Sequence, residues 1–261
     1  MLTGIDVSNH NGEINWSTAS NSIEFAMIRA GYSLTKDARF DTNISMCNTL
    51  GIPCGVYWFG YALSKDAVLN EAKKCIETIK KYKITFPVAF DWEYDSDSYY
   101  EKMTGYKLSN SLRAEYAKIF LDYVKSQGYI PALYTNIDYL NNYGFNAIKD
   151  NYDLWLAQWD VSAPKFQCAI WQKSSNGNIN GIKTKVDINI AYKNYDKVTQ
   201  PEADKKARLE TIKKDYYEKY LTIAKDIIAG KYGNGSDRKN RLKELNIDYN
   251  FAQAIVNILV L

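Results

Sequence analysis

The stretch Phe86-Pro-Val-Ala-Phe-Asp-Trp-Glu93 determines how the rest of the chain is interpreted. From Val88 onward every second residue is bulky and hydrophobic, and a period of two residues indicates a buried β-strand. The same alternation places Asp91 and Glu93 on one face of that strand, with Cα atoms roughly 6.5 Å apart. Two neighbouring carboxylates repel each other, so we expect one of them to keep a proton to a higher pH than a free carboxylic acid.

A protonated acid beside an ionised carboxylate is the arrangement that cleaves glycosidic bonds, so Asp91 and Glu93 are candidate catalytic residues. The alternative is that both are surface acids just beyond the end of a strand. The run that follows, Tyr94-Asp-Ser-Asp-Ser-Tyr-Tyr100, predicts a polar and aromatic loop, and loops at strand ends often carry functional residues.

Composition limits the classes of protein that fit this chain. A length of 261 residues suits one large domain, or one domain and a smaller one. The net charge of +3 lies wholly in residues 199–261, which hold 12 basic and 9 acidic residues, and is too mild to indicate a nucleic-acid partner. No apolar stretch approaches the roughly 18–20 residues of a membrane span. The 22 Tyr and 6 Trp residues include candidates for packing on sugar rings.

The cysteines and the single histidine, His10, argue against a zinc site or a redox motif, because no C-x-x-C pair occurs. We expect four buried thiols in a protein made in a reducing cytosol, and no metal or cofactor. The N-terminal residues lack a basic region followed by an apolar core, so we expect no signal peptide. The cysteines are Cys47, Cys54, Cys75 and Cys168.

Strand-like segments recur along residues 1–198, and the first five alternate with helical or loop segments. Predicted helices lie near residues 42–50, ended by Gly51, near 65–82, capped by Ser64, and near 112–124, ended by Gly128. About eight strands within about 200 residues favour a closed β/α barrel, with a flavodoxin-like open sheet as the alternative. The strand segments are residues 2–7, 24–29, 53–59, 86–93, 129–135, 153–159, 168–172 and 186–190.

In a β/α barrel the active site lies at the C-terminal ends of the strands. Four acids and several aromatic residues occupy such positions here, although Asp187 lies near the start of its own segment. Convergence of so many side chains from separate strands favours a functional site. The residues are Asp6, Tyr57, Phe59, Asp91, Glu93, Tyr134, Trp159, Trp171 and Asp187.

Several segments together resemble the signature segments of glycoside hydrolase family 25, the N-acetylmuramidase lysozymes of phages and bacteria. The resemblance covers roughly residues 1–196, in the order and spacing of the family. It implies an irregular β/α barrel with fewer helices than a regular one. The segments are Gly4-Ile-Asp-Val-Ser-Asn-His-Asn-Gly12, Phe90-Asp-Trp-Glu93, Leu154-Trp-Leu-Ala-Gln-Trp159, Ile170-Trp-Gln172 and Val186-Asp-Ile-Asn189.

The resemblance also implies an activity, cleavage of the β-1,4 bond between N-acetylmuramic acid and N-acetylglucosamine in peptidoglycan. Glu93 is then the general acid and Asp91 the partner carboxylate, while Asp6 and Asp187 raise the proton affinity of their neighbours. Retaining, inverting and acetamido-assisted chemistry all stay open. The expected substrate-binding residues are Tyr57, Phe59, Tyr134, Trp159, Trp171 and Asn189.

The C-terminal part has a different pattern. Residues 199–216 predict a charged, helical linker, and residues 217–261 predict three short helices around one small core. Ser236 is expected to cap the second of these helices and Asp248 the third.

Residues 228–242 resemble the choline-independent cell-wall-binding repeat of phage lysozymes, of which only one copy is visible. Because a single copy gives no avidity, we expect the helical stretch over residues 204–220 or the repeat itself to promote self-association. The alternative is a packing domain whose basic residues only solvate it. The expected wall contacts are Lys231, Tyr232, Asn234, Arg238 and Arg241.

Together these features predict a modular peptidoglycan hydrolase of the endolysin type, made in the host cytoplasm and released to the wall through a membrane pore. A catalytically silent carbohydrate-binding protein on the same barrel is the alternative, although the intact acidic pair argues against it. Chitinase-type activity ranks lower because Asp-Trp-Glu lacks the longer acidic run of chitinases.

Overall fold

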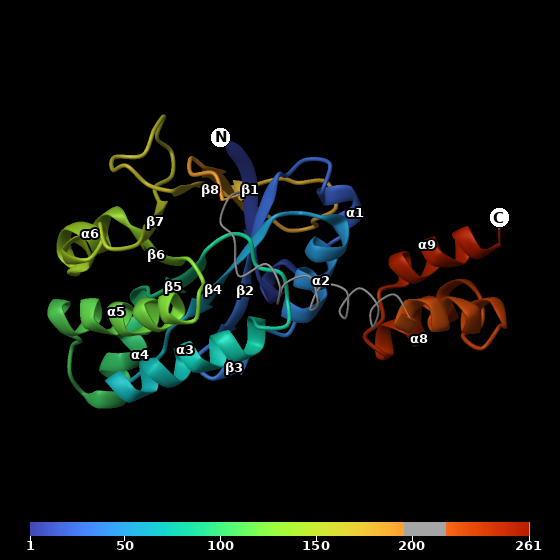
Figure 1. Ribbon diagram of the computed structural model, residues 1–261, viewed down its shortest axis with the longest axis horizontal. Coiled ribbons are helices and arrows are strands. Elements are labelled where there is room, and N and C mark those ends of the chain that lie inside the picture. The colour runs from blue at the N-terminus through green and yellow to red at the C-terminus, as the bar shows by residue number, and fades with distance from the viewer. Residues whose placement is uncertain (196–217, 261) are drawn as a thin grey trace. The chain divides into compact units, whose positions relative to one another are not determined.

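The computed structural model describes residues 1–195 and 218–260 (Figure 1). The chain divides into two compact units, Met1–Pro201 and Glu202–Leu261, and each is described by itself. The expected linker over residues 199–216 and the boundary at residue 198 lie outside the described residues. Within the described ranges, no helix is long and apolar enough to cross a membrane.

The first unit is a closed barrel, as the sequence predicts, because β1 pairs with both β2 and β9. The barrel strands β1, β2 and β4 through β8 pair in parallel, whereas β9 is antiparallel to both of its neighbours and the short β3 is antiparallel to β2. The short β3 (Thr35–Lys36) only extends the end of β2. The barrel strands are β1 (Leu2–Val7), β2 (Phe25–Tyr32), β4 (Cys54–Phe59), β5 (Val88–Asp91), β6 (Pro131–Asn136), β7 (Asp153–Ala157), β8 (Ile170–Gly177) and β9 (Val186–Ala191).

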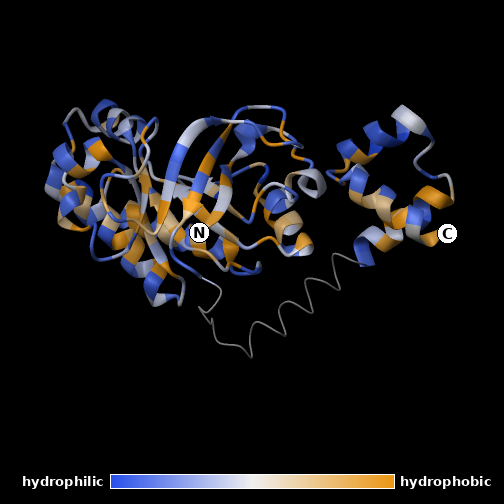
Figure 2. Ribbon diagram, turned by 90° about the horizontal axis from the view of Figure 1, so that it is seen from above, coloured by the Kyte–Doolittle hydropathy of each residue, from blue (hydrophilic) through white to orange (hydrophobic). Residues whose placement is uncertain are grey.

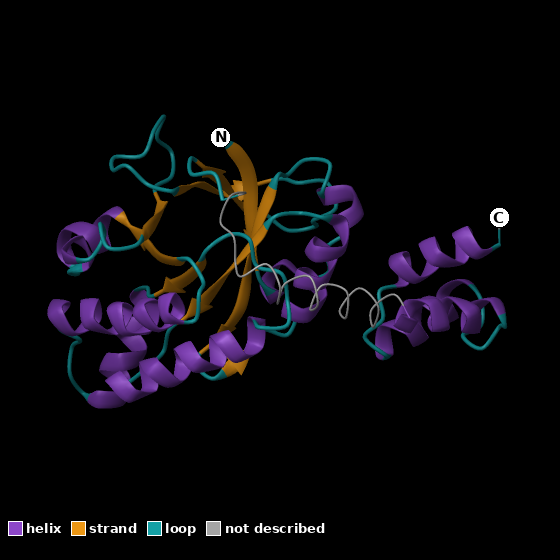
Figure 3. Ribbon diagram, viewed as in Figure 1, coloured by secondary structure: helices purple, strands orange, loops and turns teal. Residues whose placement is uncertain are grey.

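Helices occupy the connections from β1 to β7, whereas the connections among β7, β8 and β9 are loops (Figure 3). The Ser64 hydroxyl accepts the Ala67 N–H at the start of α3, and Gly51 ends α2 in the left-handed conformation, which confirms both predicted caps. The long helices are α2 (Phe40–Leu50), α3 (Lys65–Ile79), α4 (Tyr94–Thr104) and α5 (Asn110–Ser126); the shorter ones are η1 (Asn9–Asn11), α1 (Trp16–Ala19), α6 (Ile137–Asn142) and η2 (Phe145–Ala147).

The predicted loop after the carboxylate strand is wrong, because residues from Tyr94 onward form helix α4. Strand β5 ends at Asp91, and Glu93 is the N-cap residue of the helix. The Glu93 N–H donates to Ser96 Oγ at 3.2 Å, and the Asp97 N–H donates to the Glu93 carbonyl at 3.1 Å. Serine in the first turn accepts a backbone N–H that the helix leaves unpaired, and aspartate there stabilises the positive end of the helix dipole. The polar composition of the segment alone does not reveal this helix start.

One half of the barrel interior is filled by aromatic rings. Phe25 and Phe86 stack with centroids 4.6 Å apart, and Tyr195 lies 4.8 Å from Phe86. Gly4 makes room for this layer, since a Cβ there would lie 2.5 Å from the Phe25 ring. These residues stand at the N-terminal ends of the parallel strands, which we call the closed end. Hydrophobic segments alternate with hydrophilic ones along the surrounding helices (Figure 2), as expected where one helix face is buried.

The second unit contains the three predicted short helices: residues 218–228, α8 (Gly235–Glu244) and α9 (Tyr249–Leu259). Leu242 and Ala252 are fully buried between them. Asp248 caps α9 by accepting the Phe251 N–H at 2.9 Å, as predicted. The predicted cap at Ser236 is wrong, because the extended residue that precedes α8 is Asn234 and Ser236 already lies in the first turn.

Replacing Phe120 on α5 by alanine tests the packing of the helix layer on β5. The Phe120 ring is fully buried and stacks on Phe90 with centroids 4.7 Å apart. We expect Phe120→Ala to lower the free energy of unfolding by about 3–5 kcal/mol, measured by chemical denaturation. Tyr106→Ala is the control, because Tyr106 is 76% exposed and its loss should change stability by no more than about 0.5 kcal/mol. Equal effects of the two substitutions would contradict this packing.

Candidate active site

A cavity of about 490 Å³ opens at the C-terminal ends of the parallel strands, opposite the closed end. All four predicted acids line it, and so do four of the six predicted substrate-binding residues. The lining residues are Asp6, Val7, Ser8, His10, Asn11, Arg29, Tyr57, Phe59, Asp91, Glu93, Tyr134, Trp155, Trp159, Gln172, Ser175, Thr184, Lys185 and Asp187.

Asp187 reaches this cavity because β9 runs in the opposite direction to the other strands. In the antiparallel register, Asp187 is the partner of Asp6. A residue near the start of an antiparallel strand lies at the same end of the barrel as residues near the ends of its neighbours. A residue of β9 therefore reaches the cavity only if it lies near the start of the strand, as Asp187 does.

Asp6 lies at the base of the cavity and is 6% exposed. Its Oδ2 accepts hydrogen bonds from Asn189 Nδ2 at 2.7 Å and from Gln172 Nε2 at 2.9 Å. Burial, and then the charge of Asp187, raise the pKa of Asp6 well above its ordinary value, and the two amide bonds oppose this rise. Burial also raises the pKa of Asp187. The Asp6–Asp187 pair therefore keeps a proton to higher pH than ordinary carboxylic acids do.

Asp91 and Glu93 form the second acidic pair. Burial raises the pKa of Asp91 well above its ordinary value, the charges of Glu93 and Asp6 add to the rise, and Arg29 opposes it. Burial likewise raises the pKa of Glu93, with further contributions from Asp187 and Asp95, while a hydrogen bond with Tyr134 lowers it. The spacing of Asp91 and Glu93 predicts that one of them keeps its proton to a higher pH, and the raised pKa values of both agree with this expectation.

Gln172 connects several of these groups, and sequence reasoning missed it as a site residue. Its Oε1 accepts from the Tyr134 hydroxyl and from Trp159 Nε1, both at 3.1 Å, while its Nε2 donates to Asp6. The sequence predicts Trp171 as a substrate-binding residue on this strand, but the structure places it outside the cavity lining, where its Nε1 donates to the Gln158 carbonyl at 2.7 Å. Alternation along β8 explains the difference, since Gln172 points inward and its neighbour outward.

Asn189 also differs from its predicted role. It is fully buried beneath Asp6, and its Oδ1 accepts from Trp155 Nε1 at 2.8 Å. It does not line the cavity, so it orients the Asp6 carboxylate from below rather than contacting substrate.

Basic side chains on the rim were not identified from the sequence. Arg29 lines the cavity beside Asp91 and is held by Asp37, with Nε 2.8 Å from Oδ2. Lys185 and His10 lie on the same lining. His10 lies in the Gly4–Gly12 segment quoted above, whereas Arg29 and Lys185 lie in none of the quoted segments, and the only signal for Arg29 is its position at the end of the second predicted strand.

In the second unit, the five residues predicted to contact the wall cluster around the turn before α8. Arg238 donates to the Gly233 carbonyl at 3.1 Å and to Gln253 and Asn234 at 3.0 Å, so it holds the turn against α9. Lys231 pairs with Asp226 at 2.6 Å, and Tyr232 packs on the helical core. Arg241 reaches the Lys231 carbonyl at 3.5 Å.

Comparison with known proteins gives matches over both units. The profile of the CW_7 repeat matches residues 222–260. Lysozyme M1 from Streptomyces globisporus is 28% identical over 200 residues, which is 72% of this chain and 67% of that protein.

Solved structures agree with this relationship. The modular autolysin LytC from Streptococcus pneumoniae, solved in complex with a synthetic peptidoglycan ligand, is 28% identical with a TM-score of 0.63. The match covers 73% of this chain and 46% of the autolysin, so this chain spans less than half of that protein. A lysozyme from Streptomyces coelicolor has the same fold, with a TM-score of 0.64, 24% identity and coverage of 76% and 94% of the two chains.

The acidic cavity, the irregular barrel and these relatives lead to one assignment. The profile of glycosyl hydrolases family 25 matches residues 5–182, which is more than half of the chain and includes Asp6, Asp91 and Glu93. The chain therefore belongs to family 25 of the glycosyl hydrolases.

Proposed function

We propose that this protein hydrolyses the β-1,4 bond between N-acetylmuramic acid and N-acetylglucosamine in bacterial peptidoglycan. The observation that carries the proposal is the Asp91–Glu93 pair, two carboxyl groups with raised pKa values in one cavity at the strand ends. Family membership and the likeness to an autolysin that binds a peptidoglycan ligand support the same substrate. A silent binding protein would have no need of four converging acids.

Glu93 is the general acid in this proposal. Its side chain is half-buried and lines the cavity, so it can reach the glycosidic oxygen. Its raised pKa keeps the proton available, and the N-terminus of α4 stabilises the carboxylate that remains after proton transfer.

Asp91 is the partner carboxylate. It lies deeper than Glu93; burial raises its pKa, and the charge of Arg29 opposes that rise and so favours the ionised form. An anion fixed beside the substrate stabilises the positive charge that develops at the anomeric carbon during bond cleavage. Asp6 and Asp187, which together keep a proton to higher pH, line the same cavity, and Gln172 keeps Asp6 in place.

The second unit supplies wall binding in this proposal. The repeat profile and the exposed basic residues around the turn before α8 support that role. One copy of a binding unit gives one contact, so we propose that self-association of the full chain raises avidity for a polymeric wall.

Analysis of the fragments released from purified peptidoglycan tests the proposed reaction. Mass spectrometry should find N-acetylmuramic acid at the reducing end, and Glu93→Gln should abolish release because the amide is not acidic enough to protonate the leaving oxygen. Glu101→Gln is the matched control, since Glu101 is exposed on the same helix, and it should release fragments at the rate of the unmodified protein. N-acetylglucosamine at the reducing end, or normal lysis by Glu93→Gln, would refute the assignment.

The pH dependence of hydrolysis tests the charge environment of Glu93. Glu93 must be protonated, so activity falls as the pH rises through its raised pKa, and Asp91 must be ionised, so activity also falls at low pH as Asp91 takes up a proton. Asp187→Asn removes a negative charge that raises this pKa and should shift the alkaline limb of kcat/KM to lower pH. Asp95→Asn, outside the cavity lining, should shift the limb in the same direction.

Asp150→Asn serves as the control for this profile, because the Asp150 side chain is 83% exposed and contributes nothing to the pKa of Glu93. Its profile should overlay that of the unmodified protein. A limb that moved to higher pH in either test variant would show that Glu93 does not govern it.

Sedimentation with purified walls tests the second unit, with Glu93→Gln as the background so that the walls stay intact. Lys231→Ala with Arg241→Ala should reduce the bound fraction at least several-fold, because both side chains are exposed beside the turn. Lys239→Ala with Lys243→Ala removes the same charge elsewhere on α8 and should bind normally. Equal loss in both pairs would indicate only nonspecific charge attraction.

Light scattering of the same preparations should detect the proposed self-association, and a strict monomer at high concentration would rule it out.

A further inference from the structure

We propose that Asp97 is a positioning residue for the reaction, which fixes Glu93 through Trp92 and the first turn of α4. The inference deepens the proposed function and rests on it for the role of Glu93. Asp97 does not line the cavity, and no motif of the sequence singles it out.

Glu93 lies two residues beyond the end of β5, so the barrel sheet does not hold its backbone. The first turn of α4 holds it instead. Ser96 Oγ accepts the Glu93 N–H at 3.2 Å, and the Asp97 N–H donates to the Glu93 carbonyl at 3.1 Å. Ser96 is fully buried, so this turn has one fixed arrangement.

The Asp97 side chain adds a second connection on the other side of Glu93. Its Oδ1 accepts the indole N–H of Trp92 at 2.9 Å. Trp92 stands between the two catalytic carboxyl groups in the chain and is 1% exposed. Asp97 therefore holds both the residue before Glu93 and the helix turn after it.

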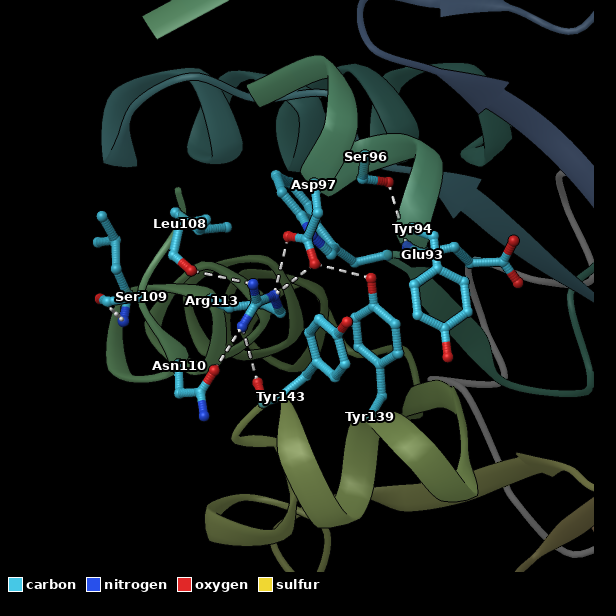
Figure 4. Close-up of polar contacts among 12 residues, drawn as sticks. Glu93, Tyr94, Ser96, Asp97, Leu108, Ser109, Asn110, Arg113, Tyr139 and Tyr143 are labelled. Atoms are coloured by element: carbon cyan, nitrogen blue, oxygen red, sulfur yellow. Dashed lines mark hydrogen bonds and ion pairs between the residues drawn. The ribbon is translucent and has the colours of Figure 1, made fainter. Parts of the chain in front are cut away.

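Asp97 is itself held by two other helices (Figure 4). Arg113 Nε on α5 lies 2.9 Å from Asp97 Oδ1, and the Tyr139 hydroxyl on α6 donates to Oδ2 at 2.8 Å. The remaining donors of Arg113 are fixed by the Leu108 and Tyr143 carbonyls and by Asn110, each at 3.0 Å. Three helices thus converge on one carboxylate that touches the strand end.

A general acid must be held within a fraction of an ångström of its substrate oxygen, and a displacement of about 1 Å costs on the order of 100-fold in rate. Loss of the Asp97 carboxylate releases Trp92 and loosens the turn that clamps Glu93. The expected result is a loss of kcat with little change of KM, because the sugar-binding surface of the cavity is untouched.

The experiment compares Asp97→Ala with Asp153→Ala in the full chain. Asp153 is a matched control: its side chain is 18% exposed against 17% for Asp97, it pairs with Lys193 at 2.7 Å, and it accepts the Tyr195 hydroxyl at 2.9 Å. It stands at the start of β7, hence at the closed end of the barrel. Both variants should lose stability in thermal unfolding, but only Asp97→Ala should lower kcat on soluble peptidoglycan fragments, by about 10- to 100-fold.

A second readout does not depend on activity. In NMR titrations of the Glu93 side-chain carboxyl, Asp97→Ala should shift its pKa to a lower value, because a loosened Glu93 is more exposed to water, and Asp153→Ala should leave it unchanged. If the unmodified protein releases no fragments, the proposed function fails, and this titration still decides the role of Asp97.

Unchanged kcat and unchanged titration in folded Asp97→Ala would overturn the proposal, and so would equal losses of kcat in the Asp97 and Asp153 variants. Should Asp97→Ala fail to fold, Trp92→Phe removes the indole N–H that Asp97 accepts, together with part of the buried ring, and keeps an aromatic ring at the position. That variant should also lower kcat and shift the Glu93 titration, and normal values of both would reject the connection.

Discussion

The structure depends on one constraint: every second side chain of a strand in a closed barrel points into the interior, and the interior has room for only a limited volume of side chains. At the closed end, Phe25 and Phe86 fill this volume, and Gly4 leaves space for them. At the other end, the inward positions of the same strands carry carboxyl groups instead. Burial raises the pKa values of these acids, because nearby hydrogen-bond donors and Arg29 compensate for the lost contact with water only in part. The architecture of the barrel therefore creates their reactivity.

The antiparallel direction of β9 completes the acidic site. A regular barrel with eight parallel strands would place Asp187 at the closed end, far from Asp6. Reversal of the last strand instead pairs the two residues in register. The irregularity of this barrel is therefore part of the site, since it brings the start of the last strand beside the end of the first.

Much of this arrangement could be predicted from sequence, for reasons visible in particular residues. The strand that carries Asp91 shows a clear period of two, and Ser64 and Asp248 are capping residues in favourable positions. Inward and outward positions are harder to separate on β8. The sequence predicts Trp171 as the substrate-binding residue there, but Gln172 forms the hydrogen bond to Asp6. The helical start after Glu93 was missed because its stability depends on bonds from Ser96 and Asp97 that composition does not show.

The reversal of β9 also decides where the barrel chain ends. Residues after Asp187 run away from the cavity, and Tyr195 packs on Phe86 at the closed end. The route by which a long glycan strand enters is thus separate from the point at which the polypeptide continues. Such a layout makes the barrel modular: accessory sequences can be joined or exchanged there over evolution without redesigning the acidic cavity.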